Sequence, residues 1–153
     1  MQDISVIRSY NDVMNSYSDI VAVETEISGY RRTCVQVSIR FDRKQIAWRD
    51  SLQWNNNFTR SLSEDCIKSL EKLLPLARVL EWETSYETND ELRITKATPT
   101  CGLPEQWLVR VIFKDGSVCQ SNGRTIFPPQ WREFREFIET ASRTPFRLRR
   151  QEG

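Results

Sequence analysis

The stretch of the chain that most restricts its fold is residues 106–141. Large apolar residues take every second position from Trp107 to Phe113, which is typical of a β-strand with one buried face. An Asp-Gly pair follows at 115–116, and such a pair is typical of the tight turn of a hairpin. Two prolines at 128–129 precede an amphipathic segment, as expected for the first turn of a helix. The stretch therefore predicts a β-hairpin followed by a helix.

The first half of the chain carries similar patterns. Apolar and β-branched residues take every second position over 21–27 and again over 35–41, and a turn containing Gly29 separates the two runs. These two runs predict an antiparallel hairpin. A third run over 45–52 predicts an outer strand with one face in water. Residues 53–60, with three consecutive asparagines, predict a loop.

A helix is expected after this loop. Its N-cap is either Ser61, which has capping-box spacing with Glu64, or Ser63. Pro75 lacks a backbone donor and clashes with the preceding turn, so the regular helix is expected to end just before it or to bend there. Residues 79–87 are then expected to form a strand.

Two further segments have less regular patterns. Residues 1–18 have mixed periodicity, which favours a short helix over a strand. Residues 88–105 are polar and contain two prolines, so they predict a long connection. Connections of this length in compact domains are mobile, functional or partly ordered by themselves.

The size and composition of the chain suit a single folded domain. Its 153 residues are enough to bury a core without a metal or a disulfide, and its 28% of charged residues, with both signs mixed, argue against disorder. Strand patterns followed by helix patterns predict an α+β fold, in which two or three helices pack on an antiparallel sheet. We expect the domain to span residues 1–142 and a basic tail to span 143–153.

An internal repeat is one explanation of the similar patterns in the two halves. The alternating run that ends at Phe41 matches the run that ends at Phe113, and an amphipathic helix follows each run. This match predicts a tandem βββα unit over residues 20–76 and 79–141. The alternative is that any two amphipathic hairpins look alike, because alternation alone produces most of the match.

Residues 80–140 contain a pattern of aromatic, glycine and proline positions. The pattern reads Trp82-x3-Tyr86, then Trp107-x-Val-x-Val-x-Phe-x-Asp115-Gly116, then Gly123 and Phe127-Pro128-x2-Trp131. It resembles a family of small uncharacterised bacterial α+β domains. The resemblance implies a small bacterial domain of this fold class, and it carries over no activity, cofactor or catalytic residue.

Several kinds of catalytic chemistry are excluded or disfavoured by the residue types. The chain has no histidine, so Ser-His and Cys-His nucleophile pairs and histidine metal ligands are impossible. No glycine-rich phosphate loop is present either. The acidic residues Glu81, Glu83 and Glu87 would share one face of a strand, where they either face solvent or serve the acid–base chemistry of a small carboxylate enzyme.

The four cysteines do not predict a metal centre. Their positions lack the close pairs of a zinc site, so no metal or cofactor is expected. In a cytosolic protein they are expected to be free thiols, whereas an oxidising compartment would allow Cys101 and Cys119 to pair. The cysteines are Cys34, Cys66, Cys101 and Cys119.

Aromatic residues within 48–60 suit a surface for a protein partner. Aromatic side chains among polar ones are typical of interaction sites. The alternative is that these rings cap the core beneath the loop. The predicted partner surface consists of Trp48, Trp54, Asn55, Asn56 and Phe58.

Nucleic-acid binding through arginine clusters is an alternative function. The net charge of +1 weighs against it, because the chain as a whole produces no strong positive field. The candidate contacts are Arg31, Arg32, Arg147, Arg149 and Arg150.

The function that the sequence favours is a non-enzymatic protein-interaction or inhibitory domain of bacterial or phage type. The N-terminus lacks the basic and apolar regions of a secretory signal, and no apolar run reaches the length of a membrane span. We therefore expect a cytoplasmic location and no membrane contact.

Overall fold

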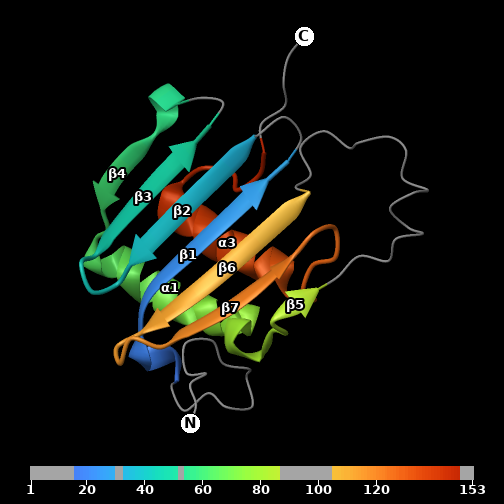
Figure 1. The fold of residues 1–153 in the computed structure, drawn as a ribbon. Helices are drawn as coiled ribbons and strands as arrows, with labels where there is room; N and C mark the ends of the chain where they lie inside the picture. Colours follow the sequence, from blue (N-terminus) through green and yellow to red (C-terminus); the bar gives the residue numbers. More distant parts are fainter. Residues whose placement is uncertain (1–15, 30–32, 52–53, 87–104, 149–153) are drawn as a thin grey trace, which may run out of the picture.

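The computed structural model describes residues 16–29, 33–51, 54–86 and 105–148. These residues form an α+β fold with one seven-stranded sheet in the order β4-β3-β2-β1-β6-β7-β5. Neighbouring strands are antiparallel, except that β5 runs parallel to β7. Within these described ranges two α-helices lie on one face of the sheet, and the opposite face carries none (Figure 1). The predicted α+β class with a mainly antiparallel sheet is confirmed.

The elements have the following bounds. The strands are β1 (Ile20–Ser28), β2 (Cys34–Arg40), β3 (Gln45–Asp50), β4 (Phe58–Ser61), β5 (Ser85–Tyr86), β6 (Gln106–Phe113) and β7 (Val118–Gly123). The α-helices are α1 (Glu64–Ala77) and α3 (Trp131–Ser142). The short 3-10 helices are η3 (Tyr17–Asp19), η5 (Trp54–Asn56) and η6 (Val79–Glu81). The helix expected within 1–18 lies mostly outside the described residues.

The two predicted hairpins are confirmed, and they meet at the centre of the sheet. β1 pairs with β2 on one side and with β6 on the other. The β6–β7 hairpin turns at Gly116, whose φ of +87° requires the conformational freedom of glycine. The sheet therefore consists of strands from both halves of the chain, joined along β1 and β6.

The predicted loop over 53–60 contains η5 and the edge strand β4, so that prediction was wrong. β3 is consequently an inner strand of the sheet, flanked by β2 and β4. The Asn57 side chain accepts a hydrogen bond of 2.7 Å from the backbone N–H of Asp50 and helps to hold the two strands together. A four-residue strand is too short to show a periodic pattern, which explains why it was missed.

The strand predicted over 79–87 was also wrong in its extent. Arg78 has a left-handed backbone with φ of 56°, and the chain continues as η6 before the two-residue strand β5. β5 pairs with β7 at the edge of the sheet, away from β6. Because these strands do not form a second three-stranded meander, the tandem βββα arrangement is not confirmed.

The structure distinguishes between the two N-caps that the sequence allowed for helix α1, and it shows where the helix ends. Ser63, and not Ser61, is the N-cap, because its hydroxyl accepts a hydrogen bond of 3.1 Å from the backbone N–H of Cys66. The helix continues past Pro75 to Ala77, so proline stands within its last turn. Pro75 removes its own backbone donor, and the helix ends two residues later.

The core lies between the sheet and the two helices. Each fully buried large apolar side chain stabilises the fold by about 1.5–3 kcal/mol before entropy is counted. The buried apolar residues of the helices are Ile67, Leu70, Leu74 and Ala77 from α1 and Phe134, Phe137, Ile138 and Ala141 from α3. They face the alternating apolar side chains of the inner strands.

Aromatic rings fill the core between β6 and α3. The Trp107 ring lies 5.2 Å from the Trp131 ring and meets the Trp82 ring edge-on at 6.0 Å, measured between ring centroids. The Trp107 indole donates a hydrogen bond of 2.8 Å to the backbone carbonyl of Ile126. The aromatic positions of the 80–140 pattern therefore build the core of the domain.

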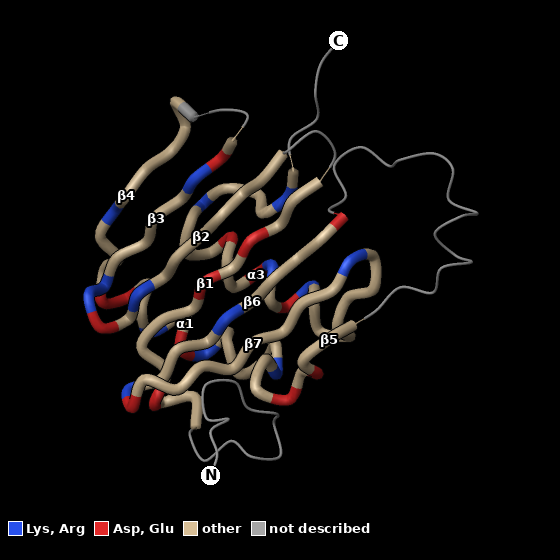
Figure 2. Tube along the Cα trace, viewed as in Figure 1, with Lys and Arg blue, Asp and Glu red and all other residues tan. Residues whose placement is uncertain are grey.

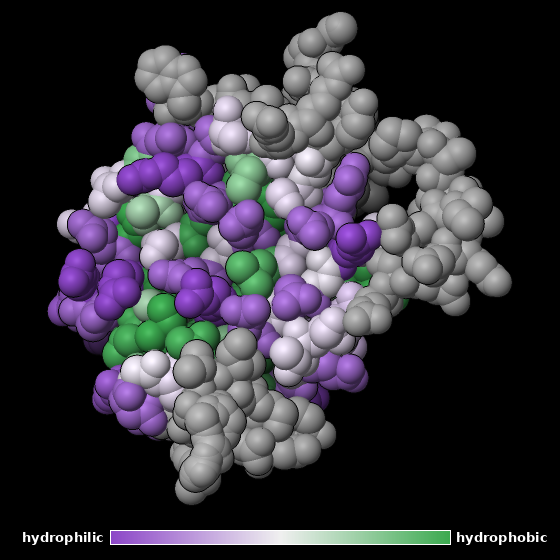
Figure 3. All heavy atoms as spheres, in the orientation of Figure 1, coloured by the Kyte–Doolittle hydropathy of each residue, from purple (hydrophilic) through white to green (hydrophobic). Residues whose placement is uncertain are grey.

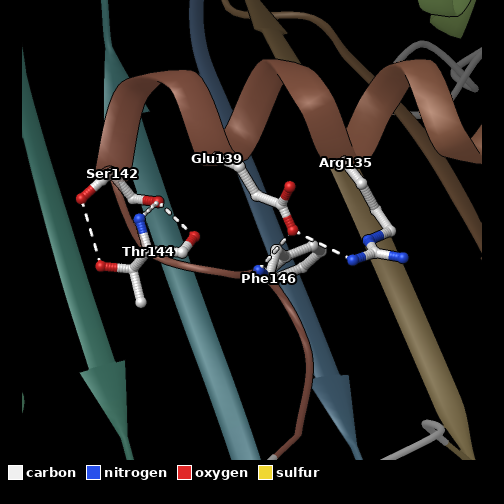
Figure 4. A network of polar contacts seen from close by, with 5 residues as sticks. All are labelled: Arg135, Glu139, Ser142, Thr144 and Phe146. Carbon is white, nitrogen blue, oxygen red and sulfur yellow. Dashed lines mark hydrogen bonds and ion pairs between the residues drawn. The ribbon is translucent and has the colours of Figure 1, made fainter.

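The ordered domain continues beyond the expected boundary at residue 142. Phe146 and Leu148 are buried, with 2% and 5% of their surfaces exposed. The Glu139 carboxylate accepts hydrogen bonds from the Phe146 backbone N–H at 2.8 Å and from Arg135 at 3.1 Å (Figure 4). These contacts hold the chain after α3 against the aromatic core.

No helix in the described part of the chain is long and apolar enough to cross a membrane.

Candidate functional site

The face of the sheet opposite α1 and α3 is the candidate site, and we name it the open face. Strand geometry directs alternate side chains to this face, so it is built from the residues between the core positions of β3, β2, β1, β6 and β7. In a space-filling view the face is mainly hydrophilic, with one larger apolar area at the lower left and smaller ones between the polar side chains (Figure 3).

Cross-strand pairing arranges the open face in rows, two of which cross its middle. Residues directly opposite one another on neighbouring strands bring their side chains into contact range. The first row is Ala47, Ser38, Glu24, Arg110 and Gln120. The second row is Arg49, Gln36, Glu26, Leu108 and Asn122.

A hollow of about 300 Å³ lies over β3, β2, β1 and β6. The small side chains of Ser38 and Ala47 line it beside the longer ones of Glu24, Gln36 and Arg49. Because two adjacent positions of the first row carry almost no side-chain volume, the surface is lower there than along the second row. The hollow is therefore a direct product of where the small residues fall in the register.

A second hollow of about 610 Å³ lies over β1, β6, β7 and β5. Its described lining includes Ser85, Asn122 and Arg124. The two hollows share Glu26 and Leu108 as lining residues, so they are neighbours on the open face. We call these two neighbouring hollows together the cross-strand groove.

Charges along the groove are unevenly compensated. Acidic residues lie on β1 and a basic residue on the adjacent strand β6 (Figure 2). The Glu24 carboxylate lies 3.6 Å from the Arg110 guanidinium. The Glu26 carboxylate, by contrast, accepts hydrogen bonds only from neutral groups among the described residues, at 3.2 Å from the Gln36 amide and 3.5 Å from the Cys34 thiol.

The Cys34 thiol is a poor nucleophile in this position. Burial, followed by the negative charge of Glu26, raises the pKa of Cys34 to about 12. Only the thiolate is a good nucleophile. Cys34 is therefore protonated at neutral pH and acts as a hydrogen-bond donor to Glu26. Of the other cysteines, Cys66 is half-buried, Cys119 is buried, and Cys101 lies outside the described residues.

The residues of the predicted aromatic partner surface differ in their exposure to solvent. Trp48 has 2% of its surface exposed and stacks on the ring of Phe58 at a centroid distance of 6.0 Å. The alternative explanation, that aromatic side chains cap the core, therefore holds for Trp48. Asn55 and Asn56 are exposed. The backbone of Trp54 belongs to η5, and its side chain lies outside the described residues.

The arginines of the nucleic-acid alternative mostly fall outside the described residues. Arg147 is exposed next to the buried Phe146. The positions that the structure leaves undescribed are Arg31, Arg32, Arg149 and Arg150.

The predicted row of carboxylates on one strand does not form. Glu81 belongs to η6 and pairs with Arg78 at 2.7 Å, Glu83 follows that helix, and Glu87 lies outside the described residues. Within the described ranges, no group of three or more histidine, cysteine or acidic side chains is arranged to hold a metal ion.

The described residues define a two-layer α+β domain in which one sheet face carries no helix. No known protein family matches the chain, and no curated protein matches it either. The residues of the cross-strand groove are the ones that sequence reasoning missed. The sequence showed only that polar residues take alternate positions in each strand. Which of these residues lie side by side depends on the register between strands, which the sequence does not show.

Proposed function

We propose that the protein is a non-enzymatic interaction domain that binds a polypeptide segment in the cross-strand groove. The observation that carries the proposal is that two neighbouring hollows, of about 300 Å³ and 610 Å³, lie on a sheet face that carries no helix from the described residues. Uncovered, hollowed surfaces with a few convergent polar groups are typical binding sites.

The lining of the groove suits the backbone of an extended chain. Gln36, Gln106 and Asn122 each carry an amide that donates and accepts hydrogen bonds, and Ser28 and Ser85 add hydroxyl groups. Backbone N–H and C=O groups of a bound segment require both kinds of partner. The six strands that the groove crosses span about 24 Å, which an extended segment of about seven residues would match.

The mixed charge of the groove favours a protein partner over a nucleic acid. Glu24 and Glu26 line it together with Arg49, Arg110 and Arg124, so it is not the predominantly basic surface that binds phosphate groups. The inhibitory role and the bacterial or phage type belong to the same proposal. The aromatic and turn pattern of residues 80–140 supports only the bacterial type.

We also propose a pairing of the two halves that differs from a tandem βββα unit. β1 and β6 form the central pair, each is followed along the chain by its outer neighbour, β2 or β7, and each half ends in a helix that packs on the same face. Superposing the halves should match β1 with β6, β2 with β7 and α1 with α3. A better superposition of β2 on β6 would contradict this pairing.

The experiment is selection of extended heptapeptides from a displayed library on the immobilised protein. Ser38→Trp fills the smaller hollow from its floor, and Ser69→Trp places the same ring at an exposed position of α1, on the other face. We expect selected peptides to bind the wild type and Ser69→Trp equally and to lose at least about tenfold in affinity for Ser38→Trp. Equal binding to all three proteins would overturn the proposal.

A second filling variant protects this test against misfolding. Ala47→Leu adds volume to the same hollow with a smaller perturbation, and circular dichroism establishes that each variant keeps the wild-type melting temperature. Peptides that bind Ala47→Leu as tightly as the wild type would count against the groove in the same way.

A further inference from the structure

We infer that the partner segment presents a cationic side chain, a lysine or an arginine, to the carboxylate of Glu26. This inference rests on the proposed function, because it names the chemistry that the cross-strand groove selects. Two observations support it: Glu26 lies in the groove, and the described groups that donate hydrogen bonds to its carboxylate are uncharged.

The charge of Glu26 is uncompensated within the described part of the chain. Its two carboxylate oxygens accept from the Gln36 amide at 3.2 Å and from the Cys34 thiol at 3.5 Å, and neither donor is charged. The two contacts fix the orientation of the carboxylate while leaving its negative charge intact. Each carboxylate oxygen has a second lone pair, so further donors can bind.

The position of Glu26 makes its charge accessible from both parts of the groove. Its side chain lines the 300 Å³ hollow and the 610 Å³ hollow, and the residue is half-buried between β2 and β6. A half-buried carboxylate attracts a cation more strongly than one in open water, because the surrounding protein screens the charge less. A side chain entering along either hollow therefore reaches the same anionic group.

Glu24 provides an internal comparison. It stands two residues earlier on the same strand and faces the same hollow, but its carboxylate lies 3.6 Å from Arg110. A partner cation at Glu24 would have to share the carboxylate with that guanidinium. The groove thus contains two similar acids, of which one is compensated and one is available.

The test uses the library-selected peptides and three matched variants. Glu26→Gln keeps the shape and removes the charge, Glu24→Gln makes the same change at the paired acid, and Glu71→Gln makes it at an exposed position of α1. We expect peptides selected on the wild type to share a lysine or arginine, and to lose about tenfold in affinity for Glu26→Gln and less than about threefold for the other two.

Replacing the shared basic residue provides the reciprocal measurement. Citrulline has nearly the shape of arginine and no charge, and norleucine takes the same place for lysine. The peptide carrying this replacement should bind Glu26→Gln and the wild type equally, because the coupled pair has already been broken. A peptide whose affinity is insensitive to both changes would overturn the inference.

The outcomes separate this inference from the proposed function. Selected peptides that lack a common basic residue but still lose affinity for Ser38→Trp would leave the groove in place and overturn the role of Glu26. Peptides whose binding is independent of Ser38→Trp and Ala47→Leu would overturn the groove itself. Peptides that depend equally on Glu24→Gln and Glu26→Gln would contradict the distinction between the two acids.

Discussion

At the scale of single residues, close contacts leave little room for change at the β7 edge of the aromatic core. Gly123 ends β7, and a Cβ atom added there would lie 2.7 Å from the Tyr86 carbonyl oxygen and 2.8 Å from the Trp107 indole nitrogen. Both neighbours are held in place, the first by its pairing in β5 and the second by its hydrogen bond to Ile126. The glycine is needed here for space.

Gly123→Ala is therefore expected to lower the free energy of unfolding by about 1–3 kcal/mol, because the backbone of β5 or the Trp107 ring must move. Urea denaturation followed by tryptophan fluorescence measures the change. Asn122→Ala, one residue earlier on the same strand, is the control and should change stability by less than about 1 kcal/mol. A loss for Gly123→Ala no larger than the control would contradict the contact.

The raised pKa of Cys34 predicts its reactivity. Because the thiol titrates near 12, iodoacetamide should modify Cys34 more slowly in the folded protein at pH 8 than in the urea-unfolded chain. Glu26→Gln should lower the pKa of Cys34 and raise the folded-state rate, since the charge of Glu26 is one of its causes. Mass spectrometry of the Cys34 peptide follows the reaction. An unchanged rate in Glu26→Gln would show that Glu26 does not act on the thiol.

At the scale of elements, β4 is joined to the end of α3 by one side chain. The Arg60 guanidinium donates a hydrogen bond of 2.8 Å to the carbonyl of Ser142 and a longer one of 3.4 Å to that of Ala141. The guanidinium also lies 4.5 Å from the centre of the Phe58 ring. The last carbonyls of a helix lack internal partners and carry partial negative charge, so a cation there is favourable.

Arg60→Ala is expected to cost about 1–2 kcal/mol of stability, because the carbonyls at the end of α3 lose a charged donor. Hydrogen exchange should rise in the last turn of α3 more than in α1. Thr59→Ala, at an exposed position of the same strand, serves as the matched control. Equal effects of the two substitutions on exchange in α3 would mean that the cap contributes nothing.

The same scale explains which elements the sequence could predict. β1, β2, β6 and β7 are long enough for alternation to be visible, and the apolar faces of α1 and α3 have helical spacing. β4 and β5 are too short for any period, and their pairing depends on contacts such as the stacking of Phe58 on Trp48. The sequence therefore did not decide whether Trp48 is buried, because strand β4, which packs beside it, has no periodic pattern.

At the scale of the whole molecule, the candidate site could not be predicted because it is a property of the register. Glu24 and Arg110 lie opposite each other, although they come from distant parts of the chain. Alternation showed that both face away from the core, but not which strands are neighbours. The hollow likewise depends on Ser38 lying beside Ala47, a pairing that neither strand encodes alone.

The C-terminal segment after α3 belongs to the same compact body. Phe146 lies 6.2 Å from the Trp131 ring and 6.4 Å from the Phe134 ring, between ring centroids. The Ser142 hydroxyl bonds the Thr144 backbone on both sides, donating to its carbonyl at 3.0 Å and accepting from its N–H at 3.2 Å (Figure 4). The described part of the predicted basic tail, residues 143–148, thus packs on the aromatic core.

Phe146→Ala is expected to lower the free energy of unfolding by about 3–4 kcal/mol, since it opens a cavity among aromatic rings. Its neighbour Arg147 is exposed, and Arg147→Ala should change stability by less than about 0.5 kcal/mol. Thermal and urea denaturation of both variants provide the comparison. A Phe146→Ala protein as stable as the wild type would show that the segment does not stabilise the core.

The central pairing of β1 with β6 also has a consequence for biosynthesis. The two strands are separated by roughly 80 residues of chain, so a ribosome adding about 5–20 residues per second needs several seconds to deliver β6 after β1. During that interval β1 has its partner β2 on one side and an unpaired edge on the other, and such an edge is a template for association between chains. Nascent chains of this protein should therefore depend on protection by chaperones until their second half emerges.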